Sequence, residues 1–496
     1  MKITASTGNL IEQAVDALIV YKSQDTDLQN AADEVDKALN GVIRTVIDSG
    51  DFTGQVKETL VLYTNGLIPA KRVIVVGLGQ SADFTPDTVR QAAAVGVQKA
   101  HSLKLNTIAT RPISAAKDAI SVEDAAQAVT EGVLLGLYYY HGQKSSDAPH
   151  VLETLTIVAD DEASTRKGIT VGTAFAEGTT LARDLINLPP NIANPAYLAS
   201  QAEKMAKSVG LKCTVLDRPQ MQALKMGALL GVAQGSDAPP KFIILEHNPD
   251  KKDDGNTVVL IGKGVTFDTG GYSLKTRDGM IGMKADMSGG AAVIGAMHTI
   301  SQLDVPLHVV GLIPASDNMV SSKAYRPQEV LTASNGTTIE IISTDAEGRL
   351  LLADALVYAQ RYNPAAVVDI ATLTGSISVA LGHAMTGVYS NDDDVFAKLN
   401  IAANTTHELV WRMPMAAEYG NSLKSDTADT KNSGGRAGGA GVAAHFLSNF
   451  VDYHWAHVDM AGMLTNEGLI AYQPQHSARG YGARLLAEFA RQWSAS

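Results

Sequence analysis

The stretch Ser343-Thr344-Asp345-Ala346-Glu347-Gly348-Arg349-Leu350 joins two segments of different periodicity. Residues 337–342 before it read as an extended run, and residues 351–359 after it have helical spacing. The acidic and basic side chains therefore sit where a strand gives way to a helix. If the backbone there is extended, a period of two places Asp345, Glu347 and Arg349 on one side of the chain.

Two carboxylates that converge on one spot repel each other unless a cation lies between them. A proton or a metal ion would serve, and hard oxygen ligands favour Mg, Mn or Zn. For an arbitrary Asp-x-Glu, a solvated acidic turn is the more common outcome. Other segments of the chain are needed to distinguish a metal site from a solvated acidic turn.

Composition places the chain among globular proteins. Its 496 residues are enough for two or more domains, and 45% hydrophobic with 19% charged residues is an ordinary balance. A formal net charge of −12 argues against general nucleic-acid binding. The one cysteine, Cys213, excludes an intramolecular disulfide and a Cys-based zinc site, and we expect it to be a buried, inert thiol.

The N-terminal region predicts neither export nor membrane insertion. Residues 11–21 are interrupted by Glu12 and Asp16, so they lack the apolar core of a signal peptide. No apolar run approaches the roughly 20 residues of a membrane helix. We therefore expect a soluble, cytoplasmic protein with no membrane partner.

Residues 1–160 alternate between strand and helix patterns, which predicts an N-terminal α/β domain with a mostly parallel sheet. The expected strands are 17–21, 58–63, 72–76 and 154–158, and the expected helices are 28–49, 89–103 and 121–140. A long helical pattern follows, and residues 161–186 are assigned to a connecting helix. The turn-rich run at 187–195 then opens a second domain, 187–496.

Residues 77–82, G-L-G-Q-S-A, imitate a dinucleotide-binding fingerprint after the strand at 73–76. The match is incomplete, because residues 83–86 delay the helix and no acidic residue follows at the ribose-binding distance. We interpret these glycines as a strand-to-helix turn. Residues 433–441, S-G-G-R-A-G-G-A-G, resemble a phosphate cradle but lack the Gly-Lys-Ser/Thr ending, so we predict no nucleotide site there.

The second domain alternates in the same way. Strands are expected at 212–216, 241–245, 257–262, 307–313, 339–342 and 367–370, with helices at 196–209, 289–302 and 350–360. The predicted fold is α/β with two domains, a smaller N-terminal one and a larger catalytic one. The larger has a central mixed, mostly parallel sheet flanked by helices, whose ligands belong at the strand carboxyl ends.

Charged residues gather in a glycine-rich loop after the strand 257–262. They are Lys263, Asp268, Lys275 and Asp286, and the last of these precedes a helix. With Asp345 and Glu347 the set becomes four carboxylates and two lysines, which we place at strand ends of one sheet. This set suits two divalent ions about 3.5 Å apart that share a bridging water and polarise a carbonyl.

The same set limits the kind of metal site. All 12 histidines lie elsewhere, so a histidine-rich zinc site is not indicated. A lysine that binds a metal must be neutral, and burial beside divalent cations can lower its pKa.

At this point the chain resembles the leucyl aminopeptidase family, the cytosolic dimetal aminopeptidases. The family hallmark is N-T-D-A-E-G-R-L, and residues 343–350 read S-T-D-A-E-G-R-L. Further segments match the family pattern at 187–191, 263–286, 314–319, 324–327, 371–375 and 455–462. The resemblance covers the second domain, and a weaker similarity extends into the first.

The resemblance implies a role for each matching residue. The tighter of two ions, Mn or Zn, would be held by Lys263, Asp268, Asp286 and Glu347. The second would be held by Asp268, Asp345 and Glu347. Lys275 would stabilise the developing oxyanion, and Arg349 would hold a bicarbonate ion that acts as general base.

The resemblance also implies the substrate and the assembly. Only N-terminal residues would be released from short peptides, because the substrate's free α-amine would sit on the tighter ion. Leu and other apolar residues would be preferred, because the pocket lining is apolar. The pocket for the N-terminal side chain would be lined by Met283, Thr372, Gly375, Ala461 and Leu464, and Leu373 would offer backbone hydrogen bonds. The family resemblance further implies a homohexamer with its sites facing an internal cavity.

One position departs from the family pattern. Ser343 replaces the family's Asn, and a serine cannot reproduce both faces of an amide, which puts the exact setting of the Asp345 loop in question. Two other functions remain open alongside the aminopeptidase. A phosphohydrolase could use the same ions, and a non-enzymatic DNA-binding or scaffolding role is disfavoured by the intact ligand set and the acidic charge.

Overall fold

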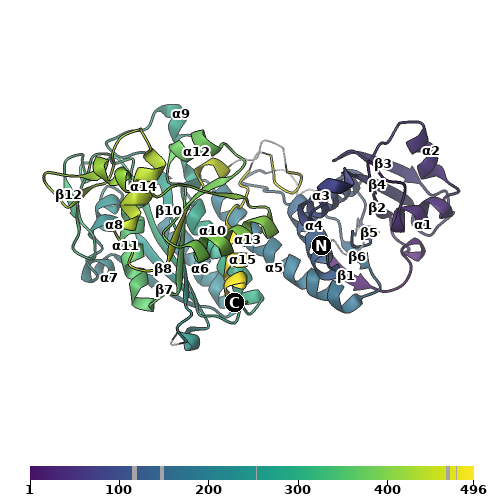
Figure 1. The fold of residues 1–496 in the computed structure, drawn as a ribbon, viewed down its shortest axis with the longest axis horizontal. Coiled ribbons are helices and arrows are strands. Elements are labelled where there is room, and N and C mark those ends of the chain that lie inside the picture. The colour runs from purple at the N-terminus through teal and green to yellow at the C-terminus, as the bar shows by residue number, and fades with distance from the viewer. Residues whose placement is uncertain (114–119, 146–149, 253, 465–469, 476, 496) are drawn as a thin grey trace. The chain divides into compact units, whose positions relative to one another are not determined.

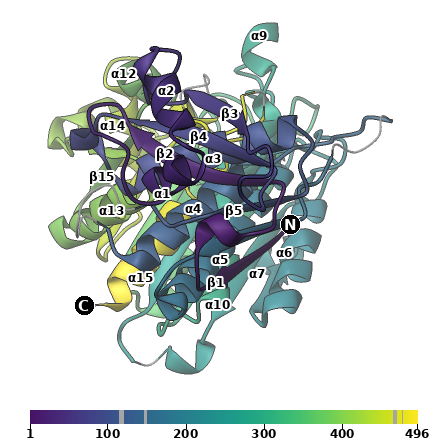
Figure 2. The ribbon, with the colours of Figure 1, turned by 90° about the vertical axis from the view of Figure 1, so that its right-hand side faces the viewer.

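The computed structural model describes residues 1–113, 120–145, 150–252, 254–464, 470–475 and 477–495. The chain forms two compact units, which we call unit 1 (residues 1–176 and 467–475) and unit 2 (177–466 and 476–496). The division falls inside the long helix α5 (Glu162–Asn187). Figures 1 and 2 show both units.

Unit 1 is built on a six-stranded sheet in the order β1-β6-β5-β2-β4-β3. All neighbouring strands are parallel except β3 and β4, which are antiparallel. The strands are β1 (Lys2–Ser6), β2 (Ala17–Ser23), β3 (Thr59–Tyr63), β4 (Arg72–Gly79), β5 (Thr107–Thr110) and β6 (Thr154–Val158). The predicted α/β sheet is confirmed.

Helices cover both faces of this sheet, because alternate residues of each strand point to opposite sides. On one face, Ile19 and Val76 pack with side chains of α3 (Pro86–Ser102) and α4 (Val122–Gly136). On the other, Val20 and Val75 pack with side chains of α1 (Asn30–Ala38) and α2 (Val42–Asp48). The helix predicted over 28–49 is therefore two helices, since Gly41 takes a left-handed φ of 81° between them.

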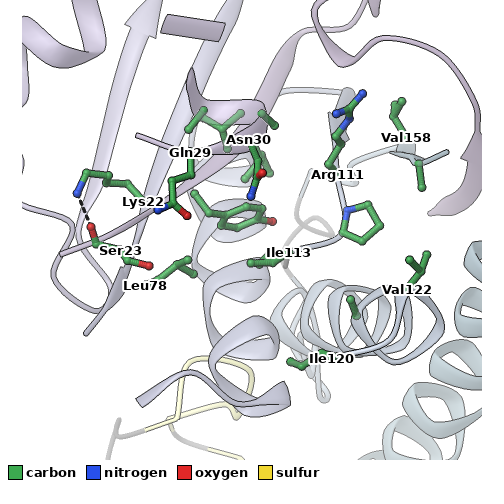
Figure 3. A pocket seen from close by; sticks show the side chains of 18 of the residues that line it. Lys22, Ser23, Gln29, Asn30, Leu78, Arg111, Ile113, Ile120, Val122 and Val158 are labelled. Carbon is green, nitrogen blue, oxygen red and sulfur yellow. Dashed lines mark hydrogen bonds between the residues drawn. The ribbon is translucent and has the colours of Figure 1, made fainter. Parts of the chain in front are cut away.

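The neighbouring strands β2 and β5 lead into helices on opposite faces. Crevices in α/β sheets form at such a point, outside the carboxyl ends of the strands. A cavity of about 390 Å³ lies there, lined among others by Tyr21, Lys22, Arg111 and Ile113 (Figure 3). The ammonium of Lys22 donates to the carbonyl oxygens of Ser23 and Thr26, the second at 2.5 Å.

The glycines that imitate a dinucleotide fingerprint belong to strand β4, so the prediction of a turn there is wrong. A Cβ on Gly77 would lie 1.9 Å from the carbonyl oxygen of Gln55, and Gly79 has a φ of 77°. These positions need glycine because another stretch of chain runs against the strand. The next α-helix, α3, begins only at Pro86, behind the N-cap Thr85.

Unit 2 is built on a nine-stranded sheet in the order β16-β15-β18-β14-β9-β11-β8-β7, with β10 paired to β11. Five of its pairs are parallel and three, β15–β18, β8–β11 and β7–β8, are antiparallel. The strands are β7 (Lys212–Leu216), β8 (Lys241–His247), β9 (Val258–Gly262), β10 (Gly264–Asp268), β11 (Val309–Asn318), β14 (Ala366–Ala371), β15 (Thr386–Ser390), β16 (Val410–Arg412) and β18 (Trp455–Asp459). The predicted mixed, mostly parallel sheet is confirmed.

Helices flank this sheet as well. Helix α10 (Ser288–Gln302) packs on β9, β11 and β14, and α6 (Pro195–Val209) and α15 (Ala483–Ser494) pack beside it. The buried helix α11 (Gly348–Ala359) packs on β9 and β11 and contacts α8 (Gly227–Ala233) and α14 (Gly439–Ser448). Other helices are α7 (Arg218–Ala223), α9 (Arg277–Met280), α12 (Gly375–Leu381) and α13 (Asp393–Thr406). Among the described residues, no helix combines the length and apolar character needed to cross a membrane.

The strand before the acidic motif does not join the large sheet. Strand β13 (Thr338–Glu340) pairs with β12 (Val330–Thr332) and β17 (Thr430–Lys431) in a separate three-stranded sheet. The prediction that the motif follows a strand of the same sheet is therefore wrong. Local pattern finds an extended run but not its partner strands, because pairing depends on distant residues.

Candidate metal centre

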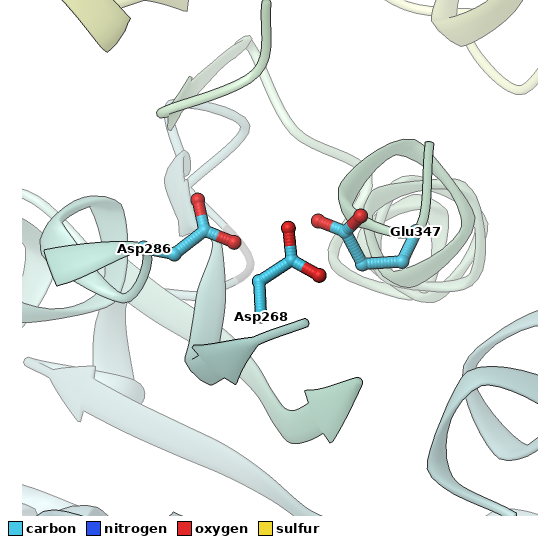
Figure 4. Close-up of side chains that lie close together, drawn as sticks. All are labelled: Asp268, Asp286 and Glu347. Carbon is cyan, nitrogen blue, oxygen red and sulfur yellow. The ribbon is translucent and has the colours of Figure 1, made fainter. Parts of the chain in front are cut away.

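Three buried carboxylates face one another in unit 2. One oxygen from each of Asp268, Asp286 and Glu347 lies within 4.8 Å of the others, and Figure 4 shows the three side chains converging. Asp268 ends β10, Asp286 precedes α10 and Glu347 directly precedes α11. Three separate elements therefore bring negative charge to one point.

The loop after β10 depends on glycine. Gly270 and Gly271 have φ values of 83° and 63°, which residues with a side chain rarely adopt. A Cβ on Gly270 would lie 2.8 Å from Oδ1 of Asp345, so glycine leaves room for that carboxylate. The local sequence thus bends the chain back and admits a fourth acidic side chain.

Lys263 follows β9 and points its amine into the cluster. Its Nζ donates to Oδ1 of Asp286 at 2.8 Å and to the carbonyl oxygen of Thr372 at 3.0 Å. It also lies 2.8 Å from Oε1 of Glu347. A Cβ on Gly348 would lie 2.5 Å from Cε of Lys263, so the glycine of the acidic motif makes space for this lysine.

Lys275 joins the other two carboxylates. Its Nζ lies 2.8 Å from Oδ2 of Asp268 and 2.6 Å from Oδ1 of Asp345. The side chain of Asp345 is 38% exposed, whereas those of Asp268 and Glu347 are nearly fully buried. The structure thus gathers all six charged residues that the sequence singled out, with Asp345 on the open side.

Burial and mutual repulsion shift the pKa values of the acids. Burial and the charge of Glu347 together raise the pKa of Asp268 to about 6, although the two lysines act in the opposite direction. Burial also raises the pKa of Asp286 and of Asp345. For Lys263, burial alone would lower the pKa, but Asp286 and Glu347 together raise it above its usual value.

The donor set fits divalent metal ions. Four carboxylates face two ammonium groups, so negative charge is in excess. Among the described residues, the buried atoms Asp286 Oδ2 and Glu347 Oε2 have no hydrogen-bond partner. A buried carboxylate oxygen without a partner is costly, and bound cations would satisfy such atoms.

The extended backbone assumed for the acidic motif is not present at Glu347. This residue has φ −72° and ψ −39°, which are helical values, so strand alternation does not place its side chain. Glu347 instead enters the cluster from the N-terminus of α11. Arg349 is the second residue of α11. It is buried, and its Nη1 donates to the carbonyl oxygen of Asn432 at 2.8 Å.

Two residues predicted for the substrate pocket bond buried carboxylates, and one of these carboxylates belongs to the cluster. The hydroxyl of Thr372 donates to Oδ1 of Asp286 at 2.7 Å. The backbone N–H of Leu373 donates to Oδ1 of Asp459 at 3.1 Å. The remaining predicted pocket residues lie in three short elements: Met283 begins η4 (Met283–Ala285), Gly375 begins α12, and Ala461 and Leu464 lie in and just after η7 (Ala461–Met463).

Two residues to which the sequence assigned no role support the site. The amide of the buried Asn318 donates to Oδ1 of Asp268 at 2.8 Å and to the carbonyl oxygen of Thr344 at 2.9 Å. The hydroxyl of Tyr325 donates to the same carbonyl oxygen at 2.8 Å. Both fall in segments that match the family pattern, and that match was the only signal that could have found them.

The cavity in unit 1 is separate from this cluster. It is lined by none of the residues predicted for metal, catalysis or substrate. We assign the functional site to the carboxylates because buried like charges need a counter-ion, whereas a cavity alone specifies no chemistry.

Comparison with known families agrees with the division into two units. Residues 180–487 match the family model described as "Cytosol aminopeptidase family, catalytic domain". Residues 17–147 match "Cytosol aminopeptidase family, N-terminal domain". The two matches together cover more than half of the chain.

Individual proteins are similar over their full length. A probable cytosol aminopeptidase of Roseiflexus castenholzii is 42% identical, with 100% of both chains covered. One of Geobacter sp. is 39% identical over 99% of this chain and 100% of its own. A mutant of tomato leucine aminopeptidase has a TM-score of 0.89 at 33% identity, covering 99% of this chain and 96% of its own. The bottromycin maturation enzyme BotP in complex with Mn has a TM-score of 0.86 at 32% identity, covering 97% and 100%.

Proposed function

Since the chain belongs to the cytosol aminopeptidase family and is a metal-dependent aminopeptidase, we propose that it releases N-terminal Leu and other apolar residues from short peptides at the carboxylate cluster of unit 2. The observation that supports this assignment is the convergence of Asp268, Asp286 and Glu347 within 4.8 Å. Peptides as the substrate class follow from the family.

Two divalent ions, Mn or Zn, would occupy the cluster. Lys263, Asp268, Asp286 and Glu347 would hold one ion, and Asp268, Asp345 and Glu347 the other. The partnerless oxygens of Asp286 and Glu347 support this arrangement. When bound, the ions would polarise the scissile carbonyl and lower the pKa of water.

Lys275 would stabilise the negative charge that develops on the carbonyl oxygen. Its ammonium lies between Asp268 and Asp345 and is the more exposed of the two lysines. An ammonium held on two carboxylates has a fixed position, so little reorganisation is needed as charge develops. Burial alone would lower the pKa of Lys275, but Asp268 and Asp345 raise it, which keeps the amine charged at neutral pH.

Arg349 would hold a bicarbonate ion as the general base. Burial lowers the pKa of Arg349 to about 10, so the guanidinium remains charged at neutral pH. Its Nη1 donates to the carbonyl oxygen of Asn432, while among the described residues its buried Nε has no partner. A fixed guanidinium with a donor to spare suits a small planar anion.

The pocket for the N-terminal side chain would be formed by Met283, Thr372, Gly375, Ala461 and Leu464, with Leu373 contacting the peptide backbone. Gly375 leaves open space where a side chain would begin. The chain would act in the cytoplasm as a homohexamer, as the family suggests. Analytical ultracentrifugation tests the assembly, because a hexamer of a 52.2 kDa chain sediments well apart from a monomer.

Hydrolysis of Leu-p-nitroanilide tests the function. We expect activity that disappears after chelation, returns with Mn or Zn, and falls when dissolved bicarbonate is removed. A phosphohydrolase at the same cluster would instead cleave p-nitrophenyl phosphate. Release of Leu by protein free of metal would contradict the proposal.

A further inference from the structure

Asn432 connects the parts of the metal centre that lie far apart in the chain. It follows β17 directly and its side chain is fully buried. Neither the acidic motif nor the lysine-bearing loop contains it. It immediately precedes the glycine-rich run 433–441, to which no function has been assigned.

The side-chain amide of Asn432 bonds the backbone on both of its faces. Its Oδ1 accepts from the N–H of Ile342 at 2.8 Å and from the N–H of Ser343 at 3.2 Å. Its Nδ2 donates to the carbonyl oxygen of Ser343 at 2.7 Å. An amide is able to do this because it carries both an acceptor and a donor.

These hydrogen bonds continue the contact between the two chain segments beyond the point where β13 and β17 stop pairing. Strands β13 and β17 pair as far as Glu340 and Lys431, and the N–H of Asn432 then donates to the carbonyl oxygen of Glu340 at 3.0 Å. Beyond that point the side chain of Asn432 bonds the peptide groups of residues 342 and 343. Backbone N–H and C=O groups need hydrogen-bond partners, and by supplying them here this amide fixes the path of the chain toward Asp345.

Two further hydrogen bonds connect Asn432 and Ser343 to side chains with a proposed function. The hydroxyl of Ser343 accepts from the N–H of Asp345 at 3.2 Å, which closes the turn that presents Asp345. The backbone oxygen of Asn432 accepts from Arg349 Nη1 at 2.8 Å. One residue thus contacts the Asp345 turn and the arginine at the start of α11.

We propose that Asn432 is a positioning residue that holds Asp345 in place for the second metal ion and Arg349 for its anion. This inference rests on the proposed function, because it assigns Asp345 to one ion only. Lys263 and Asp286 bond each other and Thr372, and no hydrogen bond joins either of them to Asn432 among the described residues. The two ions should therefore respond differently when the amide is removed.

The test compares Asn432→Ala with the control Asn391→Ala. Asn391 also bonds backbone with both faces of its amide, accepting from the N–H of Trp455 at 2.8 Å and donating to the carbonyl oxygen of Tyr453 at 2.9 Å. Trp455 starts β18, and Asp459 at the other end of this strand contacts Leu373, so Asn391 lies at the strand end away from Leu373. The control removes the same chemistry away from the site.

Both variants and the wild type are stripped of metal and titrated with Mn by calorimetry, with electron paramagnetic resonance to distinguish single from paired ions. In Asn432→Ala we expect the weaker of the two affinities to fall about 10- to 100-fold, as for other residues that orient metal ligands. The tighter affinity should change less than about threefold, and kcat should fall more than KM rises. Asn391→Ala should keep both affinities and kcat, whatever its Tm.

Equal loss of both affinities, or a lower Tm with unchanged affinities and kcat, would show that Asn432 has only a structural role. Asn432→Asp provides a second variant of the same shape, which keeps the acceptor but places an oxygen against the carbonyl of Ser343. It should lose the second ion in the same way. If neither variant folds without metal, the proposal is overturned. A wild type that binds fewer than two ions would contradict the proposed function instead.

Discussion

The amine of Lys263 lies 2.8 Å from Oε1 of Glu347, and both side chains are almost completely buried. The ammonium therefore neutralises a carboxylate that a divalent ion would also bind. A lysine binds a metal only through its neutral amine. A cation that takes Lys263 as a ligand must consequently displace a proton from a group whose pKa Glu347 and Asp286 raise.

Metal affinity should therefore rise with pH. Between pH 7.5 and 9 the carboxyl of Asp268, with a pKa of about 6, is already ionised, while Lys263 is still protonated. Loss of one proton on binding raises the apparent affinity of the tighter ion about tenfold per pH unit. Calorimetry with Mn in buffers of different ionisation enthalpy measures the proton count directly.

Lys263→Met is the matched variant for this measurement. It should bind the tighter ion more weakly and release one proton fewer. An affinity of the wild type that does not change between pH 7.5 and 9 would remove Lys263 from the ligand set.

Asp345→Ala should retain one ion per chain and lose hydrolysis. Asp345 contacts Lys275 but not Lys263, and its side chain is the most exposed of the acidic set, so its loss leaves the buried cluster intact. Metal content after gel filtration and Leu-p-nitroanilide hydrolysis give the two readouts. The exposed Asp278, in α9, provides the control Asp278→Ala, which should keep two ions and full rate. Loss of both ions in Asp345→Ala would argue against separate sites.

Lys275→Met should lower kcat about 100- to 1,000-fold, the usual cost of removing one group that stabilises an oxyanion. Metal affinity should not fall, because the ammonium competes with cations for Asp268 and Asp345. The exposed Lys323 offers the comparison Lys323→Met. If Lys275→Met lost its metal, the lysine would be a structural counter-ion rather than an electrophile.

Gly375→Ala should shift substrate preference toward small N-terminal residues. A Cβ at this position meets no atom within 4 Å, so the methyl group would project into open space without straining the fold. If that space is the pocket, kcat/KM for Leu substrates should fall about tenfold or more relative to Ala substrates. The ratio of the two substrates within one enzyme preparation is its own control. An unchanged ratio would place the pocket elsewhere.

The sequence predicts much of this molecule because its signals are local. Strands such as β14 and helices such as α10 and α11 follow from periodicity. Lys263 and Asp268 stand out because they are charged residues in a glycine-rich run of sequence next to a buried strand. The family resemblance then supplied the roles that charge alone leaves open.

What the sequence does not predict depends on pairing between distant segments. Strand β13 joins a small sheet with β17 because residues 338–340 and 430–431 meet, and no local pattern specifies that partner. Asn432 was missed for the same reason, since its function is to bond the peptide groups of residues about 90 positions earlier. The glycines of β4 were wrongly predicted to form a turn. Glycine is needed there because residues 54–55 approach the strand closely, and this tertiary contact leaves no local signal in the sequence.

The central claim is that five side chains, Lys263, Asp268, Asp286, Asp345 and Glu347, bind two divalent ions. Anomalous diffraction from a crystal grown with Mn, with data on both sides of the Mn absorption edge, tests it most directly. We predict two peaks about 3.5 Å apart, one beside Lys263 and Asp286 and the other beside Asp345. A single peak, or Mn bound away from these residues, would contradict the account.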